Sequence, residues 1–472
     1  MADHRVTRRK FLKTSSVATA AFFGSTVFDA GSLLAAGPHL RRDVGGLSST
    51  SSVLKSYKKA IHAMKALPTS NPLSWDYQAA IHGTLLAGTH TAWNTCEHGT
   101  YFFFSWHRMY LWYFERIIRK MSGHPEWALP FWNYESGAER KLPEPFRSPS
   151  AASNDLYMPN RGPGWNDGTS ELLPSSVATA AAFAHVPFND FSSSLEGTPH
   201  AAVHVSIGSW MGSISTAAQD PIFWLHHCNI DRLWNLWLAA GGGRTDPLGD
   251  STWKDTKFTF FDENGNEVQL TGCDILRAQK QLHYRYEGEP KQVELFCARH
   301  LPIPTWVKEM LFKIPEPPVV GPGPDPVPFE IDIREFRDRL SRIAAERDAD
   351  LLLDFTEVEA DRQPDVYYEV FLGLPKGAEP QFDSPYYVGN LAFFGHGVRD
   401  ERQHGGFHPA SFSFRINRAV EAALKRDAQA GSLNALLVPQ VAARDGKPIA
   451  ARASAKIRIG SAAISVRRKQ KK

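Results

Sequence analysis

The sequence predicts a mainly α-helical core followed by a β-sandwich, and three observations support this fold class. Apolar residues recur at helical spacing between Ser51 and Leu67, and Ser74 or Asp76 can cap a second helix that carries His82. After Val366 the chain consists of short runs of β-branched and aromatic residues separated by turn residues. Between these regions, residues 315–328 are dense in proline and glycine, which is typical of a stiff linker.

These observations divide the chain of 472 residues into four segments. Residues 1–36 resemble a twin-arginine export signal, because Thr-Arg-Arg-Lys-Phe-Leu-Lys precedes a weakly apolar run rich in alanine, serine and threonine. A disordered basic tail is the alternative. We therefore predict export by the twin-arginine route to the periplasm or the medium. The mature protein is predicted to have a helical domain at 37–314, a linker at 315–328 and a β-sandwich at 329–472.

Composition and charge argue against several classes of partner. Hydrophobic residues make up 42% and charged residues 22% of the chain, which is typical of a soluble globular protein. Residues 1–36 hold five Lys/Arg and two Asp/Glu, so without them the formal net charge falls from +3 to zero and nothing points to nucleic acid. No other apolar run is long enough to cross a bilayer. The four cysteines are few for an exported chain; Cys273 and Cys297 can pair, but disulfides do not define the fold.

A first cluster of histidines lies on two expected helices. His200 and His204 are four residues apart, so on a helix their rings leave the same face. Such a pair alone is common among solvated or core histidines. His227 follows in a second helical segment, which begins near Asp220 and Pro221. The sequence therefore offers three imidazoles to one metal ion.

A second cluster lies upstream, where His82, His98 and His107 supply another three imidazoles. His90 is the alternative to His82, but His82 lies in the helix-like run YQAAIHG, whereas His90 lies shortly after a glycine in an expected loop. Three neutral imidazoles per ion suit copper, while di-iron bundles add a Glu and a Glu-x-x-His, a pattern we do not find. Two metal ions at about 3.5–4 Å from each other can share one small molecule such as dioxygen.

The residues around these histidines carry further motifs, in an order and spacing that cover most of residues 50–240. They are Cys96-x-His98, Trp106-His107-Arg108, Phe131-Trp132-Asn133, Pro199-His200-x-x-x-His204 and Asp220-Pro221-x-Phe223-x-x-His226-His227-x-Asn229-x-Asp231-Arg232. Together they resemble the type 3 copper proteins, the superfamily of tyrosinases, catechol oxidases and molluscan haemocyanins. The resemblance implies a four-helix bundle that holds two copper ions, with dioxygen as co-substrate and a small phenol as substrate. The expected reaction is oxidation of o-diphenols to o-quinones, and hydroxylation of monophenols stays open.

The same resemblance implies roles for individual residues. The copper ligands would be His82, His98, His107, His200, His204 and His227, and Cys96 would form a thioether to the ring of His98. Glu196 corresponds to a glutamate that holds water and helps to deprotonate phenols, but its usual asparagine helper is Ala201 here. Ile214 falls where plant enzymes often carry a phenylalanine gate. These two departures have opposite effects on monophenol hydroxylation, so that activity is not decided. Supporting positions around the ligands would be Phe223, Asn229 and Asp231, with a helix-face ion pair as the alternative for Asp231.

The C-terminal segment resembles that of plant polyphenol oxidases and haemocyanins, which implies that it covers the copper site. Phe393 or Phe394 would enter the substrate entrance, although a place in the strand core is the commoner fate of such a residue. The expected enzyme is then latent until this segment is removed. A haemocyanin-like dioxygen carrier and a non-copper metal hydrolase are the alternative functions. The natural phenol and the oligomeric state do not follow from the sequence.

Overall fold

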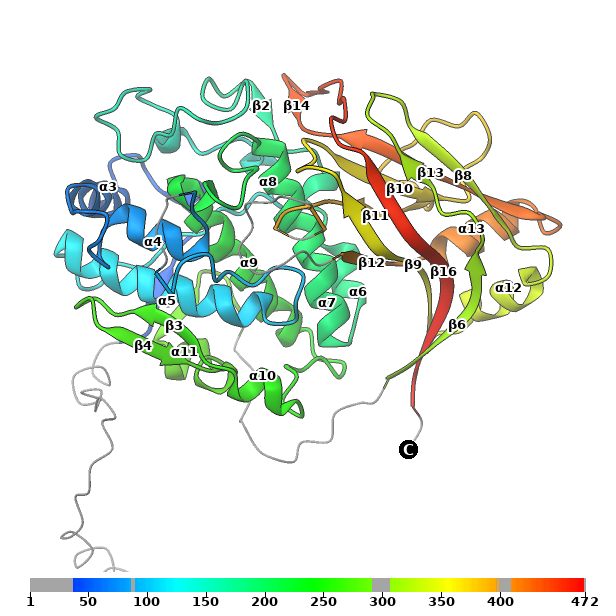
Figure 1. The fold of residues 1–472 in the computed structure, drawn as a ribbon, viewed down its shortest axis with the longest axis horizontal. Coiled ribbons are helices and arrows are strands. Elements are labelled where there is room, and N and C mark those ends of the chain that lie inside the picture. Colours follow the sequence, from blue (N-terminus) through cyan, green and yellow to red (C-terminus); the bar gives the residue numbers. More distant parts are fainter. Residues whose placement is uncertain (1–36, 86–89, 291–305, 396, 399–408, 471–472) are drawn as a thin grey trace, which may run out of the picture. The chain divides into compact units, whose positions relative to one another are not determined.

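The computed structural model of the protein describes residues 37–85, 90–290, 306–395, 397–398 and 409–470. The predicted export signal at 1–36 lies outside these residues. Helices dominate the first part of the described chain, up to residue 290, and strands dominate the part after Trp306 (Figure 1). The predicted order of a helical region followed by a sheet-rich region is therefore observed.

Four helices form the frame of the first part, and the starts of three of them follow from the local sequence. Ser51 and Ser74 cap two of them by accepting hydrogen bonds from the backbone N–H groups of Leu54 and Tyr77. Asp220 caps a third, with proline at its first position. These helices are α3 (Ser52–Lys65), α4 (Trp75–His82), α5 (Phe103–Ser122) and α9 (Pro221–Ala239).

Shorter elements complete the helical part. A kinked turn, Glu196–Ala201, leads directly into the helix α8, Ala202–Ile207. The other short helices are α6 (Ala180–Ala184), α7 (Phe188–Leu195), α10 (Ser251–Asp255) and α11 (Ala278–Gln281). The short strands are β1 (His39–Arg41), β2 (Ser170–Glu171), β3 (Phe258–Phe261), β4 (Glu267–Leu270) and β5 (Tyr284–Tyr286).

Two antiparallel sheets make up the second part, in the strand orders β11-β10-β13-β8 and β12-β9-β16-β6. They share one apolar core, which includes Val370 and Leu437 from the first sheet and Leu353 and Ile464 from the second. Their strands are β6 (Trp306–Ile314), β8 (Val327–Asp332), β9 (Ala349–Ala360), β10 (Tyr367–Leu372), β11 (Tyr387–Leu391), β12 (Ala410–Arg415), β13 (Ser432–Gln440) and β16 (Ile457–Lys469). The helices α12 (Arg337–Ala345) and α13 (Asn417–Arg426) accompany them.

The structure corrects the boundary predicted at residues 314 and 315. Strand β6 lies before that boundary, yet it pairs along its length with β16 at the end of the chain. The proline-rich segment 315–328 therefore lies within the sheet-rich part, where Val319–Val320 (β7) also pairs with β16. The prediction missed β6 because it is an edge strand whose side chains are mostly exposed, including Val307 at 50% and Met310 at 61%.

The two parts contact each other closely within the unit that runs from Pro38 onward. The side chain of Asn390 donates a hydrogen bond to the carbonyl oxygen of Ser175 at 2.8 Å, and the hydroxyl groups of Ser175 and Tyr367 lie 2.9 Å apart. Strand β14 (Ala443–Arg444), which pairs with β15 (Lys447–Pro448), also pairs with β2 of the helical part. The sheet-rich part is therefore anchored on the helical part by both polar and backbone contacts.

The cysteines of the described residues differ in their bonding state. Cys96 and Cys228 are free thiols, and Cys273 is disulfide-bonded, whereas its predicted partner Cys297 lies outside the described residues. None of the described helices combines the length and the apolar character needed to cross a membrane.

Candidate metal centre

The helices of the first part bring all six predicted ligands into one buried cluster. His82 ends α4, His107 lies in the second turn of α5, and His227 lies in the middle of α9. Potential ligand atoms within 4.8 Å of one another form three overlapping groups among the described residues. The groups are His200, His204, His226 and His227; His82, His107 and His227; and His82, Cys96 and His98.

The rings are arranged as two facing sets of three. The sets contact each other where the His107 and His227 rings stack, with centroids 4.5 Å apart and planes at 12°, and where His98 stacks on His200 at 5.4 Å. Centroid distances within the first set are 5.2 Å for His82–His98, 5.1 Å for His98–His107 and 5.8 Å for His82–His107. Those within the second set are 4.8 Å for His200–His204, 4.9 Å for His200–His227 and 5.4 Å for His204–His227.

Backbone carbonyl groups fix the orientation of four of these rings. A carbonyl oxygen only accepts hydrogen bonds, so the Nδ1 atom that faces it carries the proton and Nε2 keeps its lone pair. The Nδ1–oxygen pairs are His82 with Ile214 at 3.1 Å, His107 with Phe103 at 2.8 Å, His200 with Glu196 at 3.1 Å and His204 with Met211 at 2.7 Å. The same nitrogen, Nε2, is therefore presented to the interior of the cluster by helices from distant parts of the chain.

These lone pairs suit metal ions. The Nε2 atoms of His82, His107 and His200 are buried and have no hydrogen-bond partner among the described residues, an arrangement that is costly without a ligand. Burial lowers the pKa of His82 to about 3 and lowers the pKa values of His200 and His227 well below the ordinary value, so the rings are neutral. Neutral imidazoles without carboxylates are ligands for copper or zinc, so the residues present fit two copper ions.

His226 was not predicted as a ligand, yet its ring also borders the cluster. Its Nδ1 lies 3.1 Å from the hydroxyl oxygen of Tyr134, its Nε2 is buried without a partner among the described residues, and its centroid is 4.8 Å from that of His204. The signal in the sequence was the His226-His227 pair itself. Neighbouring residues point in different directions on a helix, and the sequence does not show that Tyr134 holds the first of the two rings against the cluster.

His90 lies outside the cluster. Its Nε2 is 2.8 Å from the hydroxyl oxygen of Tyr77, and its ring packs against Trp93 and Phe261. The structure thus brings His82, and not His90, together with His98 and His107, as the helix-like run around His82 led us to expect.

The three predicted supporting residues differ in what they contact. Phe223 packs directly against the cluster, with its ring centroid 4.2 Å from that of His227 and 4.8 Å from that of His82. Asn229 does not reach the histidines; it donates a hydrogen bond to the carboxylate of Glu135 at 2.8 Å. Only Phe223 therefore shapes the site by direct contact.

Asp231 acts as a buried brace between two ligand-bearing helices. Its carboxylate on α9 accepts hydrogen bonds from Arg108 at 2.5 Å, from Tyr284 at 2.6 Å and from Tyr286 at 2.5 Å. Arg108 directly follows the ligand His107 on α5. Asp231 was expected to organise the His227 segment together with Asn229; instead it joins that segment to α5. Its partners come from far along the chain, which explains why spacing did not reveal them.

Glu196 links the two sets of histidines. Its side chain is buried and accepts a hydrogen bond from the backbone N–H of Gly99, next to His98, at 2.6 Å, while its own carbonyl holds His200. Burial raises the pKa of Glu196 well above the ordinary value for a glutamate. Ala201 is fully buried beside His200, and Ile214 contributes its backbone carbonyl to orient His82.

The sheet-rich part places Phe394 against the histidines. The ring is fully buried and stacks on His204, with centroids 3.7 Å apart and planes at 8°, and its centroid lies 5.5 Å from those of His98 and His200. Phe393 belongs instead to the core of the two sheets, where its centroid is 5.5 Å from that of Phe412. The two candidates for a plug therefore occupy different cores, because successive side chains leave an extended chain on opposite sides.

We predict that Cys96 becomes bonded to His98 in the mature protein. The potential ligand atoms of these two residues and His82 lie within 4.8 Å of one another, so the sulfur and the ring are already neighbours in the fold. Intact-mass measurement should show a loss of about two hydrogens relative to the free-thiol chain, after allowance for the Cys273 disulfide, because one C–S bond replaces the S–H bond and one ring C–H bond while dioxygen takes up the two electrons and two protons. The Cys96→Ser variant should lack this loss, and a peptide map in which Cys96 alkylates freely would contradict the prediction.

Comparisons with known proteins agree with this site. The family model of the common central domain of tyrosinase matches residues 72–179 and 165–240, and that of the polyphenol oxidase middle domain matches residues 247–294. A tyrosinase of Hahella sp. (strain CCB-MM4) is 37% identical over 278 residues, which cover 48% of this chain and 59% of the relative. A chloroplastic polyphenol oxidase of Malus domestica is 34% identical over 299 residues, which cover 55% of this chain and 49% of the relative.

The fold has counterparts among solved structures. The structure of a latent apple tyrosinase aligns with a TM-score of 0.65 and 23% identity, covering 91% of this chain and 97% of that one. The alignment thus includes the sheet-rich part as well as the helices, whereas this chain spans 59% and 49% of the length of the two curated relatives above. Residues 72–294 of this chain are therefore similar to the central and middle domains of tyrosinases and polyphenol oxidases.

Proposed function

We propose that the protein is a copper-dependent polyphenol oxidase that oxidises o-diphenols to o-quinones with dioxygen. The observation that supports this most is the pair of facing three-histidine sets, whose carbonyl-held rings turn Nε2 inward. Two o-diphenols give up four electrons and four protons, which reduce one dioxygen to two waters. A dioxygen carrier or a zinc hydrolase could use the same histidine sets, but the similar proteins are a tyrosinase and polyphenol oxidases, which favours the oxidase.

The residues of the chain would divide the work as follows. His82, His98 and His107 would hold one copper ion and His200, His204 and His227 the other, on a four-helix bundle of α4, α5, α8 and α9. Bound copper would supply the binding and reduction of dioxygen. Glu196 would take the proton of an incoming phenol, since its raised pKa makes the carboxylate a stronger base than an exposed glutamate. Phe223 would keep water away from the far side of the rings.

The test is an assay of the copper-loaded protein with catechol and with a monophenol, before and after the sheet-rich part is released. Catechol should be oxidised with dioxygen uptake, and the Glu196→Gln variant should lose more activity toward the monophenol, whose hydroxyl proton must be removed first. No turnover of catechol by a released protein with two bound coppers would contradict the proposal. Zinc in place of copper in the protein purified from its natural host would favour the hydrolase.

We further propose that the exported protein is latent, because Phe394 covers the face of His204. The apple tyrosinase of similar fold is a latent form, as is a similar chloroplastic polyphenol oxidase of Prunus armeniaca, and both support a latent state here. Tethering gives such a plug a high effective concentration, so free phenols compete poorly with it. Export by the twin-arginine route would deliver the folded, plugged form.

A buried polar contact predicts how pH affects this latency. The guanidinium of Arg467 on β16 meets Asp190 of α7 and Asp350 of β9, and its Nη2 lies 3.0 Å from Nδ1 of His185. Burial lowers the pKa of His185 to about 3, and the positive charge of Arg467 is the second cause of this shift. The docked form therefore binds fewer protons than a released form, in which the pKa of His185 would be near 6.5. Docking should weaken up to about tenfold per pH unit as pH falls below 6.5.

The measurement is the active fraction of the full-length protein between pH 7 and pH 5. Burial raises the pKa of Asp190, so in the docked form this carboxylate takes up a proton at a higher pH than in the released form. At the lowest pH values this uptake favours docking and so opposes the weakening caused by His185. Replacing His185 with glutamine should flatten the rise in active fraction, whereas His62→Gln, at a side chain that is 81% exposed, should leave it unchanged. An identical pH profile in the His185→Gln protein would refute the assignment.

A further inference from the structure

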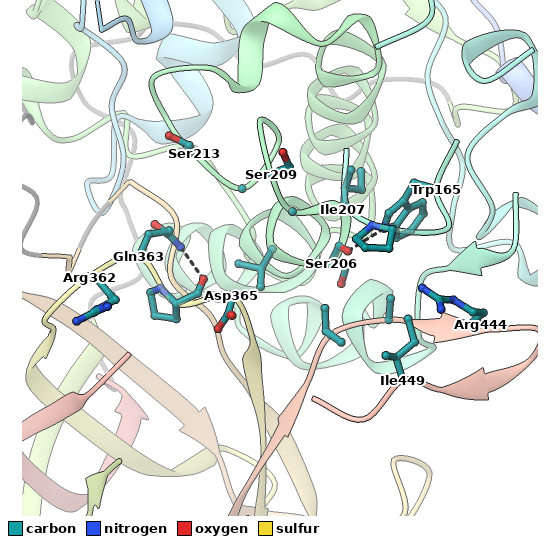
Figure 2. A pocket seen from close by; sticks show the side chains of 18 residues that line it. Trp165, Ser206, Ile207, Ser209, Ser213, Arg362, Gln363, Asp365, Arg444 and Ile449 are labelled. Carbon is teal, nitrogen blue, oxygen red and sulfur yellow. Dashed lines mark hydrogen bonds between the residues drawn. The ribbon is translucent and has the colours of Figure 1, made fainter. Parts of the chain in front are cut away.

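A cavity of about 930 Å³ lies apart from the histidine cluster, between the helical and the sheet-rich parts (Figure 2). One wall is the end of α8 and the loop after it, residues 205–213, together with Trp165. The opposite wall consists of residues 362–365 and 441–449 of the sheet-rich part. A cavity of this volume is within the range of small-molecule sites, and neither part forms it alone.

The lining combines apolar surface with an excess of positive charge. Trp165, Ile207 and Ile449 provide apolar surface. Arg362 and Arg444 also line the cavity, and Figure 2 shows them at opposite ends. The one lining carboxylate, Asp365, is already engaged, because it accepts hydrogen bonds from the backbone and the hydroxyl of Ser454 at 3.1 and 3.0 Å.

A buried hydroxyl oxygen in the wall has no hydrogen-bond partner among the described residues. The side chain of Ser206 is part of a residue that is only 3% exposed, and its Oγ makes no hydrogen bond with the described residues. Ser206 lines the cavity beside Trp165, whose indole N–H donates a hydrogen bond to the Ser206 carbonyl at 3.0 Å. A buried hydroxyl without a partner costs free energy, which a ligand recovers when the Ser206 side chain rotates its Oγ toward the cavity and donates a hydrogen bond.

We propose that this cavity binds a small aromatic carboxylate. Its carboxylate accepts a hydrogen bond from the Ser206 hydroxyl and pairs with the guanidinium of Arg444, and its ring lies between Trp165 and Ile449. An arginine fork suits a planar carboxylate, and an aromatic ring suits a wall of tryptophan and aliphatic side chains. The choice of a carboxylate follows from the charge of the lining, and the choice of an aromatic ring follows from Trp165 and the aliphatic side chains beside it.

The cavity is connected to both elements that meet at the metal centre. Gln363 in its wall donates a hydrogen bond to the carbonyl oxygen of Phe393 at 2.7 Å, directly before Phe394. The opposite wall continues into the loop whose Met211 carbonyl holds His204. Because the ligand contacts both parts, it favours the docked form, and at 100 times its dissociation constant it should shift docking about a hundredfold. This second consequence rests on the proposed latency, whereas binding itself does not.

The experiment is isothermal titration calorimetry of the full-length protein with 2-naphthoate, which has no phenolic hydroxyl and cannot be oxidised as a phenol. We expect one equivalent to bind, with about fivefold weaker binding to Arg444→Gln and unchanged binding to Lys447→Gln. These two variants each remove one positive charge from the same hairpin, but Lys447 does not line the cavity. Equal binding to both variants, or equal binding of the neutral 2-naphthamide, would overturn the proposal.

Two further variants test whether 2-naphthoate binds in this cavity or elsewhere on the protein. Ser206→Ala should weaken 2-naphthoate binding and raise the melting temperature of the ligand-free protein, because it removes a buried hydroxyl that has no partner. Ile449→Trp should fill the cavity and abolish binding while the protein stays folded by circular dichroism. Undiminished binding to a folded Ile449→Trp protein would place the ligand elsewhere and refute the site. Binding without any change in docking would leave the site intact and contradict the proposed latency.

Discussion

Replacing Phe394 with alanine is expected to raise the catechol turnover of the full-length protein by about tenfold or more. The Phe394 ring stacks on His204 with centroids 3.7 Å apart, so it covers the face that a phenol ring would need. Alanine removes this cover and the apolar surface that holds the sheet-rich part over the histidines. The effect should be seen in kcat/KM for catechol, measured at equal copper content.

The neighbouring phenylalanine provides the matched control. Phe393 is equally buried, but it packs in the core of the two sheets against Phe412. Phe393→Ala should lower the stability of the sheet-rich part by the usual amount for a large buried ring, about 3–5 kcal/mol, without opening the site to the same degree. Equal activation by both variants would mean that loosening the sheet-rich part, and not removal of the ring, exposes the site. Unchanged turnover in Phe394→Ala would refute the plug.

Replacing Asp231 with asparagine is expected to lower the free energy of unfolding of the helical part by about 3–5 kcal/mol. This is the usual effect of removing one of the two charges of a buried ion pair. Its carboxylate accepts hydrogen bonds from Arg108 and from the hydroxyl groups of Tyr284 and Tyr286, and the Arg41 guanidinium lies 3.4 Å away. Asparagine keeps the shape but removes the charge, so two buried guanidinium groups lose their shared counter-ion. Urea denaturation at neutral pH measures the change in the free energy of unfolding.

A second buried aspartate separates the charge effect from the substitution itself. Asp246 is also fully buried, but its Oδ1 accepts a hydrogen bond from the indole N–H of Trp234 at 3.0 Å, and burial raises its pKa to about 7. An asparagine side chain can accept the same hydrogen bond, so Asp246→Asn should change stability by about 1 kcal/mol or less. Similar losses in both variants would show that Asp231 is not a special brace between α5 and α9.

Features that depend on residues close together in the sequence, such as helix caps and short strands, were predicted correctly. The i, i+4 pair of His200 and His204 and a polar cap before α4 each act over a single turn of helix, so both could be predicted from the sequence; the structure chooses Ser74 over Asp76 as the cap. The strands near residues 367–372 and 387–391 were also recognised, because their β-branched and aromatic residues are concentrated in short runs.

Features that depend on distant partners did not follow from the sequence. Asp231 obtains its partners from residues more than 50 positions away, and His226 is turned toward the cluster by Tyr134, 92 positions upstream. The choice between Phe393 and Phe394 required knowledge of which side of the strand end faces the helical part. The edge strand β6 was missed because it buries too few side chains to show a pattern. Its partner strand β16 lies at the other end of the sheet-rich part of the sequence, so local spacing does not reveal the pairing.

The copper content of histidine variants tests the central claim most directly. If two facing sets of three histidines each hold one ion, the unmodified protein should bind about two coppers per chain and His200→Ala about one. His90→Ala should still bind about two, because His90 is held by Tyr77 away from the cluster. Two coppers retained by His200→Ala, or a single copper in the unmodified protein after full loading, would contradict the assignment of the six histidines.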